Sequence, residues 1–413
     1  DAYRRIRVLG AGKGAAPMAA ALENLLGDRI SDGLVIVKYG HDLPEGQRTR
    51  HIRIKEGGHP VPDEAGAAAA GEIVDMARDS REDDLVLCTF TGGASALTPA
   101  LHPEIPLADM QRLTCMLLEC GATIHEINTL RKHLSRFSGG SLVRAAFPAT
   151  VLGLIVSDVV GDDLDVIASG PTVPDPSTFA DCLRVVEHYG LRWKMPQSIW
   201  AHIEGGLQGR TPETPKADEP AFGRVRNVLV ASVKQALEAA ADEAARCGFV
   251  PRILTTAMSG EARRTAEQLV AEARRAQAGL RPGDAPLCLL AGGETTVTIR
   301  GSGKGGRNQE MALAATLELA DDRGIDLICV GTDGTDGPTD AAGGYAFSGD
   351  LARLRAIGLH PKESLDANDS YPLLLKAGTL LRTGPTRTNV MDMAIMLVLS
   401  LIHISEPTRP ERI

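Results

Sequence analysis

The stretch Ile6-Arg7-Val8-Leu9-Gly10-Ala11-Gly12-Lys13-Gly14-Ala15 decides the fold. Its apolar start predicts a buried strand, and its glycines predict a tight turn, because glycine adopts backbone angles that other residues avoid. A helical stretch follows at residues 17–26. Strands and helices alternate in the same way further along the chain, so the sequence predicts an α/β fold with parallel sheets covered by helices.

The alternation of strands and helices is broken once. Residues 204–224 carry glycines and prolines instead, which is typical of a loop or a linker. We therefore expect two α/β domains with a cleft between them, one over residues 1–215 and one over residues 225–391.

The composition argues against several classes of protein. With 413 residues, of which 43% are hydrophobic, the chain is long and apolar enough for globular domains. A net charge of −9 and an aromatic content of 3% argue against nucleic acid as a partner. No apolar run reaches membrane-spanning length and no signal peptide is recognised, so we expect a cytoplasmic protein without a membrane partner. The seven cysteines form no CxxC pair, which fits reduced thiols, and a homo-oligomer is compatible with these features.

The first glycine turn suits an anionic ligand. Gly10 and Gly12 belong to a G-x-G-x-x-A pattern, a weak signal for a nucleotide pyrophosphate at a helix N-terminus. The next strand ends at Lys38 rather than at the acidic residue that holds an NAD ribose, although an NADP site tolerates a lysine there. Lys13 suits a phosphate or a carboxylate, and the alternative is a solvated surface lysine.

The second glycine turn, Thr91-Gly92-Gly93-Ala94-Ser95, offers bare amides for a carboxylate or a phosphate. It differs from the G-x-S-x-G motif of serine hydrolases, so Ser95 is a better candidate for a ligand contact than for a nucleophile. Asn128, Arg131 and Lys132 are spaced three and four apart on a predicted helix and share one face. That face is either a binding surface or a solvated one.

Acidic loops follow two other predicted strands. Asp158 comes after a strand over residues 151–156, and Asp333 and Asp336 lie in the loop 331–340 after another strand. Carboxylates in such loops hold Mg²⁺ or take a proton from a hydroxyl group, and the alternative is a series of turns that cap a helix.

Two further glycine loops complete the inventory. Glu294 follows the glycines that end a strand, and Arg307 and Asn308 open a helix behind the loop 301–306. This loop is not a Walker A motif, because Lys304 precedes a glycine. Arg307 suits a two-pronged contact with phosphate oxygens, and the alternative is a capping turn with a surface arginine. Basic glycine loops together with acidic loops indicate a phosphotransferase without a P-loop.

Nine motifs occur in a fixed order along the chain: Gly10-Ala11-Gly12-Lys13-Gly14-Ala15, Glu56-Gly57-Gly58-His59-Pro60-Val61-Pro62-Asp63, Thr91-Gly92-Gly93-Ala94-Ser95-Ala96-Leu97, Asn128-Thr129-Leu130-Arg131-Lys132-His133-Leu134-Ser135, Ser157-Asp158-Val159-Val160-Gly161-Asp162, Ser169-Gly170-Pro171-Thr172, Gly292-Gly293-Glu294-Thr295-Thr296-Val297, Gly306-Arg307-Asn308-Gln309-Glu310 and Gly331-Thr332-Asp333-Gly334-Thr335-Asp336-Gly337-Pro338. This series resembles the class II glycerate 2-kinases, some of which carry the older label hydroxypyruvate reductase.

The resemblance implies ATP- and Mg²⁺-dependent phosphorylation of D-glycerate to 2-phosphoglycerate. It implies a Rossmann-like N-terminal domain, a smaller C-terminal domain and an active site in the cleft. A lysine and an arginine that are essential in the family fall on Lys13 and Arg307.

The remaining roles are hypotheses from side-chain chemistry. We expect Asp333 to act as the base, Asp158 and Asp336 to hold the metal, Gly92, Gly93, Ser95, Asn128 and Arg131 to bind glycerate, and Gly10, Gly12, Glu294 and Asn308 to bind the nucleotide. Two alternatives stay open. One is an NAD(P)H-dependent hydroxypyruvate reductase, and the other is a non-catalytic sugar-acid binding protein.

The chain departs from the family pattern at several positions. Val233 stands where an asparagine is common, and Arg387 and Met391 replace a glycine and an asparagine in the usual TGPTGTNVND-like ending. Residues 400–413 resemble nothing in the family and are expected to be a non-native tail, and the natural amino terminus is expected to be missing.

Overall fold

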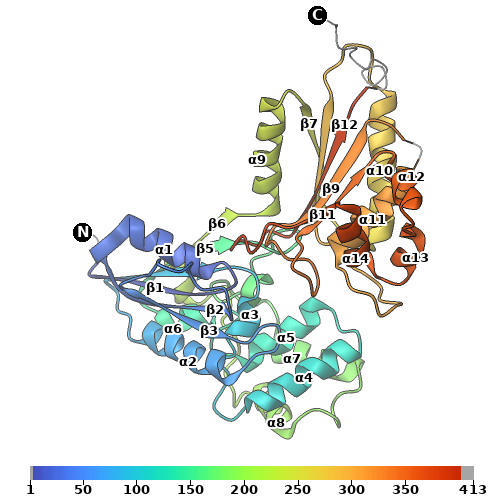
Figure 1. Ribbon diagram of the computed structural model, residues 1–413. Helices are drawn as coiled ribbons and strands as arrows, with labels where there is room; N and C mark the ends of the chain where they lie inside the picture. Colours follow the sequence, from blue (N-terminus) through green and yellow to red (C-terminus); the bar gives the residue numbers. More distant parts are fainter. Residues whose placement is uncertain (1–2, 321, 401–413) are drawn as a thin grey trace, which may run out of the picture. The chain divides into compact units, whose positions relative to one another are not determined.

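The computed structural model describes residues 3–320 and 322–400, which form two compact units. Unit 1 holds the chain up to Ser157 together with Asp162–Val230, and unit 2 holds Asp158–Gly161 together with the chain from Ala231 onward. Each unit is built on its own six-stranded sheet (Figure 1). Among the described residues, no helix combines the length and the apolar character needed to cross a membrane.

Unit 1 contains β1 (Arg5–Ala11), β2 (Ile30–Lys38), β3 (Ile52–Gly57), β4 (Asp84–Phe90), β5 (Thr150–Val156), β6 (Val225–Ala231), α1 (Ala15–Leu26), α2 (Glu64–Arg78), α3 (Ala94–Leu97), α4 (Leu107–Glu119), α5 (Ile124–Leu134), α6 (Ser141–Ala146), α7 (Phe179–His188), α8 (Gln197–Leu207) and the 3-10 turns η1 (Gly27–Arg29), η2 (Ile167–Ser169) and η3 (Pro220–Arg224). Unit 2 contains β7 (Val250–Met258), β8 (Leu287–Gly293), β9 (Ile325–Gly331), β10 (Gly343–Phe347), β11 (Leu380–Leu381), β12 (Asp392–Val398), α9 (Val233–Arg246), α10 (Ala262–Ala278), α11 (Arg307–Glu318), α12 (Asp350–Ala356), α13 (Pro361–Asp366) and α14 (Ser370–Ala377).

The sheet of unit 1 has the strand order β3-β2-β1-β4-β5-β6. The pairs β1–β2, β1–β4, β2–β3 and β4–β5 are all parallel. This is the order of a Rossmann-type sheet, whose direction of winding reverses between its first and fourth strands. The Rossmann-like, parallel sheet expected for the N-terminal domain is therefore confirmed.

Alternate residues of the first two strands face helix α1. Ile6, Val8, Val35 and Val37 pack with the alanines of α1 in one hydrophobic cluster. Helices α2, α3 and α6 contact further strands of the sheet. Helices alternate with the strands in chain order except between β2 and β3, which are joined by a loop. A separate hydrophobic cluster is formed by residues of α4, α5, α7 and α8, so these helices make a layer with a core of its own.

Two glycines let β1 lie unusually close to β4. A Cβ atom on Gly10 would come closer than 3.0 Å to the hydroxyl and the carbonyl oxygen of Thr89. One on Gly12 would meet Thr91 in the same way, and Gly12 also has φ +131°, which side chains rarely allow. The glycines of the first turn are thus explained by the packing of the two central strands.

The sheet of unit 2 has the order β11-β10-β9-β12-β8-β7 and is mixed. Only β7 and β8 pair in parallel, whereas β12 lies antiparallel between β8 and β9, and β10 is antiparallel to β9. The expectation of a parallel sheet was wrong for this unit. The reason is that β9 and β10 are joined by a loop without a crossover helix, and that β12 inserts between the two earlier strands β8 and β9.

Successive residues of β8 face opposite helices. Leu287, Leu289 and Ala291 belong to the cluster that contains residues of α10 and α11. Cys288 and Leu290 belong to the cluster that contains residues of α9. Figure 1 shows α9 on one side of this sheet and α10 with α11 on the other. This period of two explains why the strand reads as a continuous apolar run.

Strand β6 belongs to the first sheet, although the sequence pattern suggested that it opens the second domain. Asn227 on β6 donates through Nδ2 to the backbone oxygen of Thr172 in unit 1, at 3.0 Å. The change of unit therefore falls at residues 230 and 231 rather than in the predicted stretch between 215 and 225. The expected non-native tail, residues 400–413, lies outside the described residues apart from Ser400.

The departures from the family ending fall at strained backbone positions. Arg387 has φ +60° and Met391 has φ +68°, in the left-handed region that glycine and asparagine tolerate best. The side chain of Met391 is buried and shares a hydrophobic cluster with Val233, the third departure. Two positions at which asparagine is usual thus carry apolar residues in one cluster.

The close packing of β1 against β4 predicts opposite effects for two glycine substitutions. Gly10→Ala should lower the free energy of unfolding by about 2 kcal/mol or more, because the strand backbone of β4 cannot yield. Gly71→Ala, in α2, should raise it by about 0.5–1 kcal/mol, because its Cβ meets nothing within 4 Å and alanine favours helix. Urea unfolding at pH 7 measures both, and a loss below about 0.5 kcal/mol for Gly10→Ala would contradict the packing account.

Candidate active site

The first two glycine turns lie side by side at the carboxyl ends of β1 and β4. The amide of Lys13 donates to the carbonyl oxygen of Gly92 at 2.9 Å, and the amide of Thr91 donates to that of Ala11 at 3.1 Å. The amide of Gly14 donates to Oγ1 of Thr91 at 2.9 Å. Sheets of this type bind ligands where the winding reverses, which is between these two strands. The predicted loops therefore meet at the expected place.

The amides of the first turn are already used within the protein. Besides Lys13 and Gly14, Gly12 donates to the carbonyl oxygen of Ile36 at 3.0 Å and Ala15 donates to that of Gly12 at 3.1 Å. No amide from residue 12 to residue 15 is left for a pyrophosphate. The structure thus gives no support to the predicted nucleotide contact at Gly10 and Gly12, and strand packing accounts for both glycines.

The second turn differs in this respect. The amides of Gly92, Gly93 and Ser95 have no acceptor within the described part of the chain. Gly93 has φ +87°, and a Cβ atom there would lie 3.0 Å from the ring of His59 and 3.6 Å from Cγ of Lys13. Free amides beside a lysine are suited to an anionic ligand.

A chain of hydroxyl and amide groups borders this turn. Oγ of Ser95 lies 2.8 Å from Oγ of Ser169, whose hydroxyl donates to Oδ1 of Asn128 at 3.1 Å. Ser169 and its neighbour Ala168 have φ +58° and +55°, which is uncommon for residues with side chains and is often found at functional sites. The predicted residues Ser95 and Asn128 are thus brought together, and Ser169, quoted only as part of a motif, joins them.

Arg131 lies beside the same groups. Together with Ser95 and Ser169 it lines a narrow cavity of about 20 Å³, which has room for about one water molecule. Its guanidinium has no hydrogen bond or ion pair with any described residue. Burial lowers the pKa of Arg131, as expected for a charge without a counter-ion. A carboxylate ligand would compensate this cost.

His59 is a site residue that sequence reasoning missed. Its Nδ1 atom is buried without a hydrogen-bond partner among the described residues. Burial, together with the nearby charge of Lys13, lowers the pKa of His59 to about 4. The ring is therefore neutral at pH 7. Its place in the motif Glu56-Gly57-Gly58-His59 was the available signal.

Unit 2 carries a second group of predicted residues around Arg307. The guanidinium donates from Nε to Oδ2 of Asp392 at 2.6 Å and from Nη2 to Oδ1 of Asp392 at 3.1 Å, and Nη1 donates to Glu294. Burial raises the pKa of Asp392 to about 6 against the opposing charge of Arg307. Asp392 had no signal in the sequence beyond its place in the family ending. Two N–H groups of Arg307 remain for a further acceptor.

Asp336 has a structural role at the start of α11. Its Oδ1 accepts from the amide of Asn308 at 3.1 Å, and its Oδ2 accepts from the amide and the side chain of Gln309 at 2.8 and 2.9 Å. Burial raises the pKa of Asp336, and the hydrogen bonds from Gln309 and Asn308 oppose this. These bonds explain the carboxylate as a helix cap, so a metal role for Asp336 stays a prediction without structural support.

Asn308 is fully buried and bonds to Asp336 through Nδ2 at 3.4 Å. The side chain of Asn308 therefore has no access to solvent, and the structure gives no support to the predicted contact with a nucleotide. The carboxylate of Glu294, by contrast, is half exposed beside Arg307. The sequence could not separate the two, because both follow glycine loops.

The other two acidic candidates also lie in unit 2. Oδ1 of Asp333 accepts from the amide and the hydroxyl of Thr335, both at 2.9 Å. Oδ2 of Asp158 accepts from Nδ2 of Asn389 at 3.2 Å. Asp158 was expected in the first domain, but residues 158–161 pack with unit 2. Both carboxylates offer oxygen atoms of the type that Mg²⁺ prefers.

The lowered pKa of His59 predicts a pH-dependent stability. The unfolded chain binds a proton at this residue near pH 6.5 and the folded chain only near pH 4, so its contribution is complete above pH 6.5 and is lost as the pH falls towards 4. Between pH 7 and pH 5 the wild type should lose up to about 2 kcal/mol more than His59→Gln. Urea unfolding of both proteins at the two pH values measures the difference, since all other histidines cancel. Equal losses would show that the ring is protonated in the folded state.

Known proteins resemble the chain over most of its length. The family model of a domain of unknown function, DUF4147, matches residues 1–204, and that of the MOFRL family matches residues 287–392. The glycerate 2-kinase of Pyrococcus horikoshii is 43% identical over 397 residues, which are 96% of this chain and 88% of that protein. The D-glycerate 2-kinase of Thermotoga maritima is 42% identical over 394 residues, 95% of this chain and 91% of that protein.

The likeness extends to solved structures. The crystal structure of glycerate kinase from Thermotoga maritima superposes with a TM-score of 0.87 at 41% identity and covers 96% of this chain and 92% of that one. A relative from Agrobacterium vitis, 43% identical over 396 residues, carries the provisional name of a hydroxypyruvate reductase. Order of motifs, fold and identity agree, and the chain belongs to the class II glycerate 2-kinase family.

Proposed function

We propose that this protein transfers the γ-phosphoryl group of ATP to the 2-hydroxyl of D-glycerate and releases 2-phosphoglycerate and ADP. Relatives named glycerate 2-kinase, similar over most of the chain, support the reaction class. The observation that carries the substrate is that the free amides of Gly92, Gly93 and Ser95 lie beside Arg131, which lacks a counter-ion among the described residues.

The carboxylate of glycerate binds at the second glycine turn. The amides of Gly92, Gly93 and Ser95 donate to it, and Arg131 supplies the opposite charge. Ser169 and Asn128 are buried and hold the hydroxyl of Ser95 through hydrogen bonds, so Ser95 is the proposed contact for a hydroxyl of the substrate. The cavity beside Arg131 holds only about 20 Å³, so glycerate occupies the turn itself and not this cavity alone.

The chemical step is one displacement at phosphorus. The 2-hydroxyl oxygen forms a bond to the γ-phosphorus, the bond from that phosphorus to the bridging oxygen of ADP breaks, and the hydroxyl proton passes to a carboxylate, for which Asp333 is the candidate. Lys13 and Arg307 stabilise the charge on the transferring group, each by roughly 10²- to 10³-fold in rate. The proposal uses residues of both units, and the expected active site in a cleft stays a prediction.

Magnesium is the metal that such a transfer requires. The oxygen donors of Asp158 fit this ion, whereas both oxygens of Asp336 are engaged by α11. Bound Mg²⁺ neutralises the phosphates of the nucleotide. Asp158 is therefore the proposed ligand on the protein, and Glu294 is retained as a contact on the nucleotide side.

One observation favours the alternative of an NAD(P)H-dependent reductase, namely the Rossmann strand order of unit 1. Two others oppose it. The amides of the first turn are used internally, and β2 ends at Lys38 instead of an acidic residue. Either dinucleotide would thus lack its pyrophosphate amides, and NAD would also lack its ribose acceptor.

The test uses the full chain with ATP, Mg²⁺ and D-glycerate, and the product is identified by ³¹P and ¹³C NMR. We expect 2-phosphoglycerate and an equal amount of ADP. Oxidation of NADH or NADPH by hydroxypyruvate without turnover of ATP would replace the proposal by the reductase. Glycerate binding without any turnover would replace it by a binding protein.

Removal of the guanidinium of Arg131 should weaken the binding of glycerate but not the binding of ATP. Arg131→Met should raise KM for glycerate by about 10- to 100-fold, the value of a charge-assisted contact, and leave KM for ATP nearly unchanged. Arg144→Met is the matched control, since Arg144 is an arginine of the same unit that pairs with Glu219. Steady-state kinetics with each substrate varied gives both constants. A rise in KM for ATP instead would move this turn to the nucleotide.

The two carboxylates assigned to different tasks should respond differently to neutralisation. Asp158→Asn should raise the Mg²⁺ concentration for half-maximal activity, because a ligand is lost. Asp336→Asn should leave that concentration unchanged and lower the free energy of unfolding by about 1–3 kcal/mol, because its amide donors lose their acceptor. Mg²⁺ titrations and urea unfolding of both variants separate the roles. A shifted Mg²⁺ requirement in Asp336→Asn alone would exchange the assignments.

A further inference from the structure

Two histidines and one glutamate gather in unit 1, and none of them belongs to the candidate residues described above. His102, Glu104 and His202 each offer one ligand atom, and these atoms all lie within 4.8 Å of one another. His102 and Glu104 belong to the segment between α3 and α4, and His202 belongs to α8. Two imidazoles and one carboxylate are a ligand set that zinc proteins use.

The hydrogen bonds of His202 leave one ring nitrogen facing the cluster. Its Nε2 atom lies 2.9 Å from the backbone oxygen of His133, which accepts the N–H of that nitrogen. Its Nδ1 atom lies 2.8 Å from Oε1 of Glu104. A cation placed between Nδ1 and Oε1 would bond to both atoms.

The bond to His133 gives His202 the support that metal-binding histidines usually have. Such a histidine donates its other ring N–H to a carboxylate or a backbone carbonyl, which holds the ring in place. Zinc–ligand bonds of about 2.0–2.2 Å set tetrahedral ligand atoms about 3.3 Å apart. The separation between His202 and Glu104 needs only a small opening to reach this value, and the side chain of His202 is fully buried.

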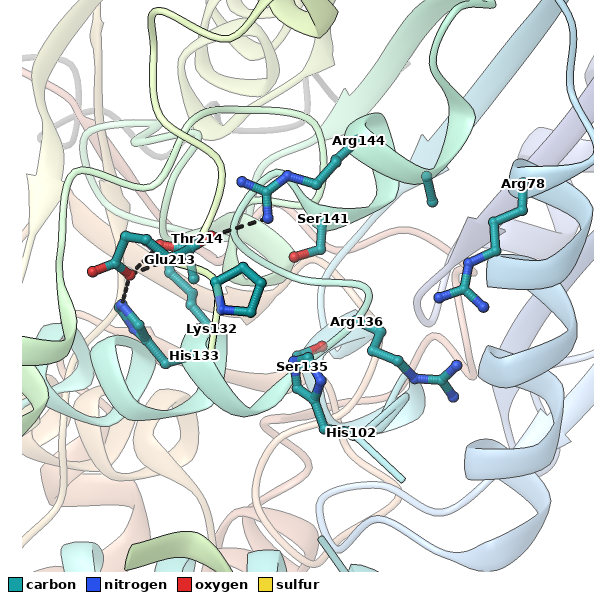
Figure 2. A pocket seen from close by; sticks show the side chains of 12 residues that line it. Arg78, His102, Lys132, His133, Ser135, Arg136, Ser141, Arg144, Glu213 and Thr214 are labelled. Carbon is teal, nitrogen blue, oxygen red and sulfur yellow. Dashed lines mark hydrogen bonds and ion pairs between the residues drawn. The ribbon is translucent and has the colours of Figure 1, made fainter. Parts of the chain in front are cut away.

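His102 supplies an available third ligand. Its ring centroid lies 4.5 Å from that of His202, with an angle of 42° between the planes. Its side chain has no hydrogen bond or ion pair with a described residue. Figure 2 shows that it borders a cavity, which has a volume of about 350 Å³ and gives access for an ion and for a fourth ligand.

We propose that His102, Glu104 and His202 bind one divalent cation of the zinc class, with a fourth position open to the cavity. Nitrogen ligands favour zinc over the magnesium of the kinase reaction. Arg78 and Arg136 line the same cavity, and their charge weakens the binding of a bare cation. Glu104 offsets part of this charge, and the arginines favour hydroxide or another anion as the fourth ligand.

The site has a positioning role for the proposed substrate turn. It ties the segment of His102 to α8, and the bond from His202 to His133 extends the tie to α5, the helix of Arg131. Leu101 and Ser135 form an isolated β-bridge, and both line the cavity of Arg131. The cation thus stabilises the wall of the candidate glycerate site without contact with the reacting atoms.

The test measures metal binding by the full chain after dialysis against EDTA. Cys115→Ser and Cys247→Ser form the background, because these two thiols are exposed and would compete for zinc. Co²⁺ absorption should report one equivalent bound through nitrogen and oxygen, displaced by Zn²⁺ and unaffected by millimolar Mg²⁺. Zn²⁺ at 100 times its dissociation constant should also raise the thermal midpoint, as any ligand of the folded state does.

Variants assign the ligands. Glu104→Gln and His102→Asn should each weaken Co²⁺ binding by at least about 10-fold, the lower bound for loss of a partner in such sites. His188→Asn removes an exposed histidine outside the cluster and should change nothing. Circular dichroism confirms that each variant is folded. Absence of stoichiometric binding would show that His202 and Glu104 are only an ion pair, and binding unchanged in both ligand variants would move the metal elsewhere.

Discussion

The close approach of β1 to β4 is the constraint on which the arrangement of unit 1 depends. A side chain at Gly10 would collide with Thr89 of β4, and one at Gly12 would collide with Thr91, which follows β4. Thr91 and Gly92 then take up the amides that follow β1. In consequence the amides of the first turn are engaged within the protein, and the second turn, next to it, keeps the amides of Gly92, Gly93 and Ser95. The two glycine loops look alike in sequence, but the loop after β4 accepts hydrogen bonds from the amides of the loop after β1.

In unit 2, too, some of the candidate residues hold others in place. Asp336 caps α11, and Asp392 holds Arg307 at the first residue of that helix. Buried carboxylates are costly without partners, and here each has several. They fix the direction of Arg307, whose remaining N–H groups are available to a phosphate. A positioned arginine loses little freedom when it binds, which suits a role in the transition state.

The sequence predicts the elements better than their order in space. Runs of apolar residues identify the central strands of unit 1, because a buried parallel strand is apolar throughout. Glycine turns identify the loops that follow these strands, because the ligand loop of such a strand is glycine-rich. The place of β6 in the first sheet and of β12 between β8 and β9 depends on contacts between distant segments, which no local pattern contains.

The same reason explains the site. Gly92, Gly93, Ser95, Asn128 and Arg131 are predicted as substrate contacts from a local pattern, and the structure places the last three around one turn. The structural role of Asp336 and the burial of Asn308 depend on a pairing across 28 residues, and His59 owes its low pKa to its surroundings. The residue type determines which chemistry a side chain can perform, and its burial and hydrogen-bond partners determine whether it is free to perform it.

The carboxylate of glycerate is proposed to bind the amides of the turn after β4 and not those of the turn after β1. A crystal structure of the full chain with D-glycerate tests it most directly. We predict a carboxylate within about 3 Å of the amides of Gly92 and Gly93, with the guanidinium of Arg131 beside it. A carboxylate bound instead to the amides of residues 12–15, with the hydrogen bonds to Thr91 and Gly92 broken, would contradict it.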